Sequence, residues 1–170
     1  MLRFPLFLGF FPVFSSERVF HCDFEADWCG AEDIPGDFLL SESNTDTPTH
    51  GTGPQFGDHT SGNGYFIFAE CSWPRKEGDK AGIVVRNLLC STGLGNVQGY
   101  LSRKGSDASL FRVTKRASSY GNFSIWNDDE TLGQIDVNRS VKEDWEAFNF
   151  DFKNDPDEKF EIGKGRNEHF

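Results

Sequence analysis

The residues of this chain that have catalytic side-chain chemistry do not form a recognisable catalytic pattern. Asp58 and His59 are adjacent and Ser61 follows, which supplies the three residue types of a hydrolase triad. They lie in a stretch rich in Gly, Ser and Thr, where polar side chains commonly bond their own backbone. We therefore expect no catalytic residues, and a secreted hydrolase built on Asp58 and His59 is the least favoured function.

The four cysteines suggest a disulfide framework. Cys22 and Cys29 are seven positions apart, and a chain that turns back between them can join the two in a small loop. Cys71 and Cys90 remain, and either they pair with each other or one of them pairs outside the chain. Four cysteines allow three connectivities, so the sequence alone does not choose between them. Zinc is disfavoured because there is no close Cys or His pair.

The N-terminus predicts the secretory pathway. Residues 1–15 combine one positive charge, Arg3, with an uncharged apolar run over 4–14 and small residues before the expected cleavage after Ser15. This pattern is typical of a secretory signal peptide, and the run is too short for a membrane-spanning helix. We expect a secreted or extracellular protein, or the ectodomain of a membrane protein, with no direct membrane insertion. Asn122 and Asn138 each begin a glycosylation sequon.

The charge balance excludes some partners. The chain of 170 residues has 17 Lys and Arg against 27 Asp and Glu, a formal net charge of −10. Nucleic-acid phosphates and anionic lipids attract basic surfaces, so neither is expected as a partner.

Short alternating runs predict an all-β fold after the signal peptide. The clearest run is Glu146 to Phe152, where three Phe alternate with polar residues. The other expected strands are Val19–Phe24, Tyr65–Ala69, Ile83–Leu89, Gly99–Ser102, Leu110–Thr114, Phe123–Trp126 and Phe160–Ile162. Residues 41–64 and 153–158 are expected to be loops. Eight or nine such strands fit an antiparallel β-sandwich of two facing sheets.

Three groups of motifs resemble a MAM domain, the module named after meprin, neuropilin and receptor tyrosine phosphatase mu. The first runs Cys22-Asp-Phe-Glu25 and continues as Trp28-Cys29-Gly30. The second runs Gly51-Thr-Gly-Pro54, then Gly57-Asp58-His59-Thr60, then Gly62-x-Gly64-Tyr65-Phe66. A third segment follows, from Glu70 to Arg75 and from Gly78 to Ala81. The similarity is good over residues 19–89 and faint over 99–162.

The resemblance implies a MAM-like domain over residues 19–170, of jelly-roll type, without catalytic activity. It implies contacts with extracellular proteins, including homophilic contacts with a second copy. No cofactor is expected, but some family members hold Ca²⁺ or Na⁺, and Glu25, Asp27 and Asp58 offer the oxygen ligands that Ca²⁺ prefers. The alternative is that Glu25 and Asp58 only cap turns and pair locally.

The match to the family departs at two places. The family's last strand is expected beyond Phe170, so the C-terminal strand is expected to be missing. Cys90 best matches the family's third cysteine, whose partner lies further on, so either a Cys71–Cys90 bond replaces the usual pairing or Cys90 stays unpaired.

Two alternative functions remain open. One is a lectin-like jelly roll, in which the four Trp (28, 73, 126 and 145) would form a sugar-stacking platform. Trp in a sandwich more commonly anchors the core or a loop. The other is a non-catalytic accessory domain of a secreted enzyme.

Overall fold

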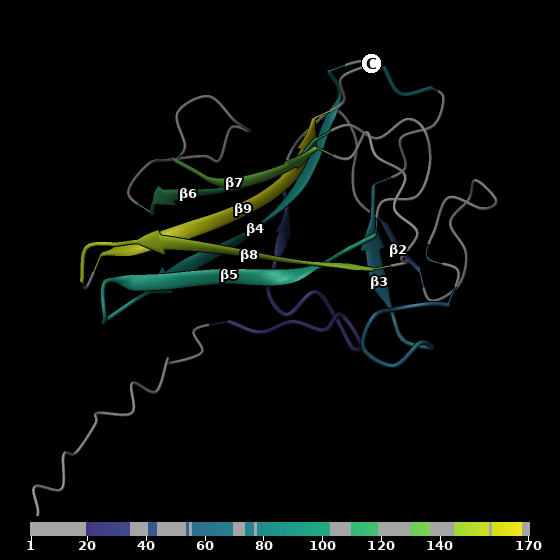
Figure 1. Ribbon diagram of the computed structural model, residues 1–170, viewed down its shortest axis with the longest axis horizontal. Coiled ribbons are helices and arrows are strands. Elements are labelled where there is room, and N and C mark those ends of the chain that lie inside the picture. The colour runs from purple at the N-terminus through teal and green to yellow at the C-terminus, as the bar shows by residue number, and fades with distance from the viewer. Residues whose placement is uncertain are drawn as a thin grey trace, which may run out of the picture.

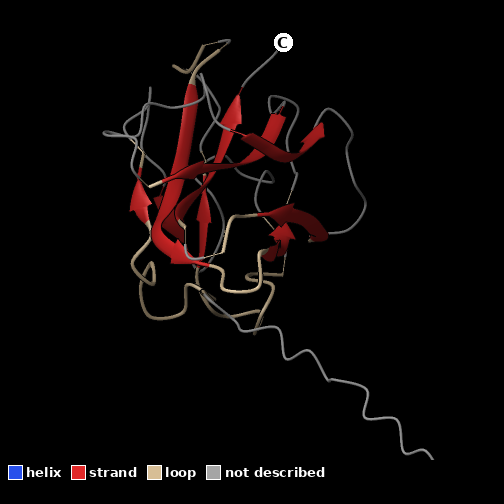
Figure 2. Cartoon of the chain, turned by 90° about the vertical axis from the view of Figure 1, so that its left-hand side faces the viewer, coloured by secondary structure: helices blue, strands red, loops and turns tan. Residues whose placement is uncertain are grey.

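The computed structural model describes residues 20–34, 41–43, 54, 56–69, 74–76, 78–102, 110–118, 130–136, 145–156 and 158–167. Over these residues it forms nine strands and no helix (Figure 2). The strands are β1 (Glu32–Asp33), β2 (Ser41–Ser43), β3 (Phe66–Phe68), β4 (Lys80–Leu89), β5 (Leu94–Leu101), β6 (Leu110–Ala117), β7 (Glu130–Asp136), β8 (Glu146–Lys153) and β9 (Lys159–Asn167). The expected all-β class is confirmed.

The strands form two facing antiparallel layers, as Figure 1 shows. One layer is a five-stranded sheet in the order β1-β4-β9-β6-β7. The other contains β5 and β8, which pair over their whole length without a register shift. A short β2-β3 ladder completes the arrangement. The predicted two-sheet β-sandwich is therefore confirmed, and its jelly-roll connectivity stays a prediction.

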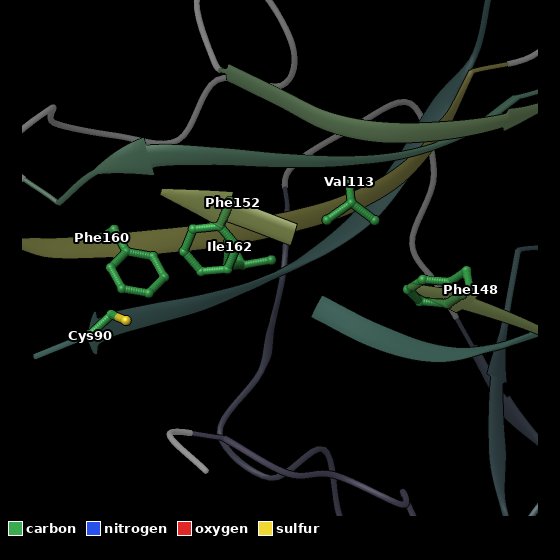
Figure 3. Close-up of a cluster of buried hydrophobic side chains, with 6 residues drawn as sticks. All are labelled: Cys90, Val113, Phe148, Phe152, Phe160 and Ile162. Atoms are coloured by element: carbon green, nitrogen blue, oxygen red, sulfur yellow. The ribbon is translucent and has the colours of Figure 1, made fainter. Parts of the chain in front are cut away.

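The main core lies between the two layers. Phe148 and Phe152 project from β8 towards Val113 of β6 and towards Phe160 and Ile162 of β9, as Figure 3 shows. The alternation expected for β8 is observed, because Phe148 and Phe152 are buried and Phe150 is half-buried, while Asn149 and Asp151 are exposed. The inner side of β5 alternates in the same way, with Gly95, Val97 and Gly99 turned inward.

Most of the expected strands are present, and all of them are longer than the sequence indicated except β3, which is shorter. The strands expected from Tyr65, Ile83, Gly99, Leu110, Glu146 and Phe160 correspond to β3, β4, β5, β6, β8 and β9. Strand β2 was not expected, because it forms inside the stretch interpreted as a loop over 41–64. Strands β1 and β7 were also missed, and the strand expected over Phe123–Trp126 lies outside the described residues.

The strand expected over Val19–Phe24 is wrong for the part that the structure describes, residues 20–24. Phe24 has a φ of 62°, which no extended strand tolerates. The Glu25 amide also donates to the Asp23 carboxylate at 3.2 Å. A side chain that bonds the neighbouring backbone in this way offers an alternative to a strand ladder.

Candidate functional site

The N-terminal loop over 22–29 is closed by the cysteines that the sequence paired. The sulfur atoms of Cys22 and Cys29 are 2.09 Å apart, at disulfide distance. Cys29 has a φ of 53°, and its amide donates to the Asp27 carboxylate at 2.5 Å. The loop is therefore fixed by one covalent link and by side-chain bonds to its own backbone.

A second tight loop is organised around Asp58, whose side chain is only 5% exposed. One carboxylate oxygen accepts the amides of Thr60 and Ser61 at 2.6 and 2.7 Å. The other accepts the Gly64 amide at 2.6 Å and the Ser61 hydroxyl at 3.0 Å. Burial raises the pKa of Asp58, but the hydrogen bonds from Ser61, Gly64 and Thr60 outweigh it and lower this pKa from 3.8 to about 2.

Glu25 joins the two loops. Its carboxylate lies against the α-carbon of Gly64, where a β-carbon would come within 2.0 Å of both carboxylate oxygens. The pKa of Glu25 is raised, first by burial and then by the negative charge of Asp58 and a hydrogen bond shared with it. A side chain at position 64 would therefore displace the Glu25 carboxylate from the place where the two loops meet.

The expected cation ligands do not come together as a set of three. Asp27 is bonded to the Cys29 amide, and the described residues contain no group of three or more Asp, Glu, His or Cys side chains that could hold a metal ion. Asp58 accepts four hydrogen bonds, which use the roughly four lone-pair positions of a carboxylate. The Ca²⁺ or Na⁺ site on Glu25, Asp27 and Asp58 therefore stays a prediction, beside the alternative of capped turns and local pairing, and Oε1 of Glu25 is buried without a hydrogen-bond partner.

The residues considered for a hydrolase triad have other partners. The Ser61 hydroxyl donates to Asp58, and the ring of His59 stacks on Tyr100 with 3.2 Å between ring centroids. A triad needs the serine hydroxyl bonded to the imidazole and the imidazole bonded to the carboxylate. The observed contacts stabilise the loop and do not activate a nucleophile.

Trp145 anchors the Asp58 loop to the sandwich. It immediately precedes β8, its indole N–H donates to the Gly57 carbonyl at 3.0 Å, and its ring meets Phe66 of β3 edge-on. Trp145 is half-buried in these contacts, as a Trp that joins a loop to a core commonly is. Trp28 is also half-buried, and Trp73 and Trp126 lie outside the described residues.

Cys90 is a free, buried cysteine at the end of β4. Its thiol donates to the Leu94 carbonyl at 3.1 Å. The Cys71–Cys90 bond that the sequence left open is therefore not formed, which leaves Cys90 unpaired. Cys71, the sequons at Asn122 and Asn138, and the segment 1–15 all lie outside the described residues.

Sequence reasoning missed the polar row on the outer side of β5 and β8. The Asn96 side-chain amide donates to the Asn149 side chain and, at 2.6 Å, to Asp151. Tyr100 lies on the same side, is 51% exposed and carries the stacked His59. The sequence predicted a strand only from Gly99. The outward-facing residues could have been identified only if the strand had been predicted to begin at Leu94.

Comparison with known families adds no assignment. No protein-family model matches this chain. Within the part of the chain that the structure describes, no helix is long and apolar enough to span a membrane.

Proposed function

We propose that this chain is a non-catalytic, MAM-like extracellular module of jelly-roll type whose role is to bind other proteins. The supporting observation is the contact between the disulfide-closed loop over 22–29 and the loop around Asp58. The residues that carry the family resemblance (Cys22, Glu25, Cys29, Asp58 and Gly64) are used to build one folded unit. In that unit Asp58 satisfies backbone amides and the cysteines close a loop, which is a framework role.

The contacts around this unit favour a binding role over a hydrolytic one. His59 and Ser61 are engaged with Tyr100 and Asp58, so the loop has no prepared nucleophile and base. Loops held on a rigid sandwich are common binding surfaces, because the framework fixes their shape without taking part in chemistry. The proposed partners are extracellular proteins, including a second copy of this chain.

Two measurements test the proposal. The first expresses the full chain in cultured animal cells and looks for it in the medium, with the Cys22–Cys29 link identified by peptide mapping without reduction. The second coats beads with purified protein and measures bead clustering and binding to a panel of purified ectodomains. Secretion with selective binding is the expected result. Retention in the cytosol, or secreted protein that binds no panel member and clusters no beads, would contradict the proposal.

The same panel separates the alternatives. A glycan array that gives selective binding, lost on substitution of exposed aromatic side chains, would favour the lectin-like function. Activity towards a hydrolysable ester that is lost in His59→Ala would favour the hydrolase. An accessory domain would bind the substrate of a secreted enzyme and not an ectodomain.

A further inference from the structure

Among the described strands, β5 pairs on one side only, with β8. Its ladder with β8 continues into the turn, where the Asn154 amide donates to the Gly93 carbonyl at 3.0 Å. Since the residues of an antiparallel strand alternate between bonded and non-bonded pairs, the odd-numbered residues of β5 bond to β8. The even-numbered residues Leu94, Asn96, Gln98 and Tyr100 point their backbone N–H and C=O groups away from β8.

One end of this outer edge is already closed. The Leu94 carbonyl accepts the Cys90 thiol and the Thr92 hydroxyl, each at 3.1 Å. At Asn96, Gln98 and Tyr100, no described residue pairs with the outward backbone groups. The donors and acceptors left unpaired by the described part of the chain are therefore arranged symmetrically about Gln98.

The β5 edge also lacks the usual protection against strand pairing. Natural edge strands carry charges or proline that discourage another strand from adding. The sequence of β5, Leu-Gly-Asn-Val-Gln-Gly-Tyr-Leu, has neither. By contrast, β7 at the edge of the large sheet contains Glu130 and Asp136. On the far side of β8, the Lys115 ammonium occupies the Lys153 carbonyl.

We propose that β5 pairs antiparallel with β5 of a second copy of this chain, about a two-fold axis at Gln98. In this register Gln98 faces the partner's Gln98, and Asn96 faces the partner's Tyr100. All the unpaired groups at 96, 98 and 100 are then satisfied by about six main-chain hydrogen bonds. The symmetry of the free groups favours a second copy over an unrelated strand, because the same edge supplies the complement on both sides.

The side chains agree with this register. Leu94 and Tyr100 are exposed apolar residues near the two ends of β5, at 67% and 51%. Leu94 becomes the diagonal neighbour of the partner's Tyr100, a spacing within reach of an aromatic ring. On the inner side Val97 faces the partner's Gly99, so the two β5-β8 pairs form one four-stranded layer in which the polar and apolar faces match.

Charge sets the expected salt dependence of this dimer. Each copy has a formal net charge of −10, so two copies repel each other, while the paired edge itself carries no charge. Salt screens the repulsion between exposed charges. The dimer is therefore expected to strengthen as salt is added, opposite to an interface held by ion pairs.

The test measures the sedimentation of the full chain over a range of concentrations. Wild type is expected to form a dimer. Gln98→Lys and Gln98→Glu should each weaken it by up to ~5-fold, because like charges then face each other across the axis. Mixing the two variants should restore a dimer. Gln134→Lys is the matched control, since it places the same charge at an exposed position on β7 of the other sheet.

Each outcome decides the question once circular dichroism shows the variants to be folded. A monomeric wild type, a dimer insensitive to Gln98→Lys, or a mixture that stays monomeric would overturn the proposal. The biological role of the β5 dimer rests on the proposed binding function. The bead assay distinguishes a failure of the dimer proposal from a failure of the proposed function. Ectodomain binding without a dimer contradicts the edge alone, whereas a dimer without any binding or clustering contradicts the proposed function alone.

Discussion

The ring of Phe152 on β8 lies directly over the α-carbon of Gly95, its partner on β5. A β-carbon at position 95 would come within 2.1 Å of the tip of that ring. The same relationship recurs where Phe148 faces Gly99, with 2.8 Å to the nearest ring atom. The missing side chains of these glycines therefore provide the space that the β8 rings occupy.

We expect Gly95→Ala to destabilise the fold by about 1–3 kcal/mol, because the added methyl forces Phe152 or the backbone to move. Urea unfolding followed by fluorescence measures the change. In a Phe152→Leu background the same Gly95→Ala change should cost less, because the shorter side chain leaves room. Equal costs in the two backgrounds would show that the ring and the glycine are not coupled.

The sequence predicted the β8 alternation, but it did not explain Gly95 and Gly99. Single-strand periodicity identifies Phe148, Phe150 and Phe152 as one face. It does not say which strand faces them, and the reason for glycine on β5 becomes visible only in the register between β5 and β8. The start of β5 was placed at Gly99 and not at Leu94 for the same reason, because glycine is unfavourable in an isolated strand.

The candidate site was predicted in part. Sequence spacing identified the Cys22–Cys29 pair, because both partners lie in one short segment. The contact of Glu25 with Asp58 and Gly64 joins segments far apart in the chain. The resemblance to the MAM family grouped Glu25 with Asp58 for a different reason, as ligands of a cation. The backbone amides that Asp58 accepts become visible only in the fold, and no residue pattern reveals them.

Asp58 is expected to make the fold sensitive to acid. Its folded pKa of about 2 lies below its ordinary value of 3.8, so its contribution is fully present above about pH 4 and is lost as the pH falls towards 2. Over that range the lost stability is about 2 kcal/mol. Urea midpoints measured against pH should show this slope in wild type. Asp58→Asn should flatten the slope, and an unchanged slope would assign the acid sensitivity to other groups.

The contribution of Glu25 to stability is expected to change with pH in the opposite direction to that of Asp58. Its raised pKa means that the ionised form is disfavoured in the fold, so its contribution becomes less favourable as the pH rises through that pKa. Glu25→Gln should therefore stabilise the protein at pH 7 and have a smaller effect in mild acid. Unfolding at the two pH values measures the difference. Destabilisation at pH 7 would mean that the negative charge of Glu25 is needed.

Removing the Cys22–Cys29 bond should cost about 2–3 kcal/mol by the chain-entropy estimate for so short a loop. The Cys22→Ser, Cys29→Ser double variant tests this by thermal unfolding without reductant. Cys90→Ser is the control, because that cysteine is free and a serine hydroxyl keeps a donor for the Leu94 carbonyl. A double variant as stable as wild type would show that the loop is held by its side-chain bonds alone.

Glu161 should be far more sensitive to substitution than Glu32, although both bind Arg86. Glu161 is 5% exposed and accepts from Arg86 and Arg116, whereas Glu32 binds Arg86 at the surface. Glu161→Gln leaves two arginines facing a neutral group and should cost about 3–5 kcal/mol, against less than about 1 kcal/mol for Glu32→Gln. Urea unfolding of both variants checks the ranking, and similar costs would contradict it.

The place of β9 in the large sheet has a consequence for how this protein is made. Strand β9 is the last of the nine in chain order, yet it lies between β4 and β6 and pairs with both. While the chain is being synthesised, β1-β4 and β6-β7 can form only separate ladders, each with an unsatisfied edge. The sheet joins only when β9 has left the ribosome, and pairing across such long separations is slow. A nascent chain is thus exposed to unwanted strand addition at two edges that the finished protein does not present.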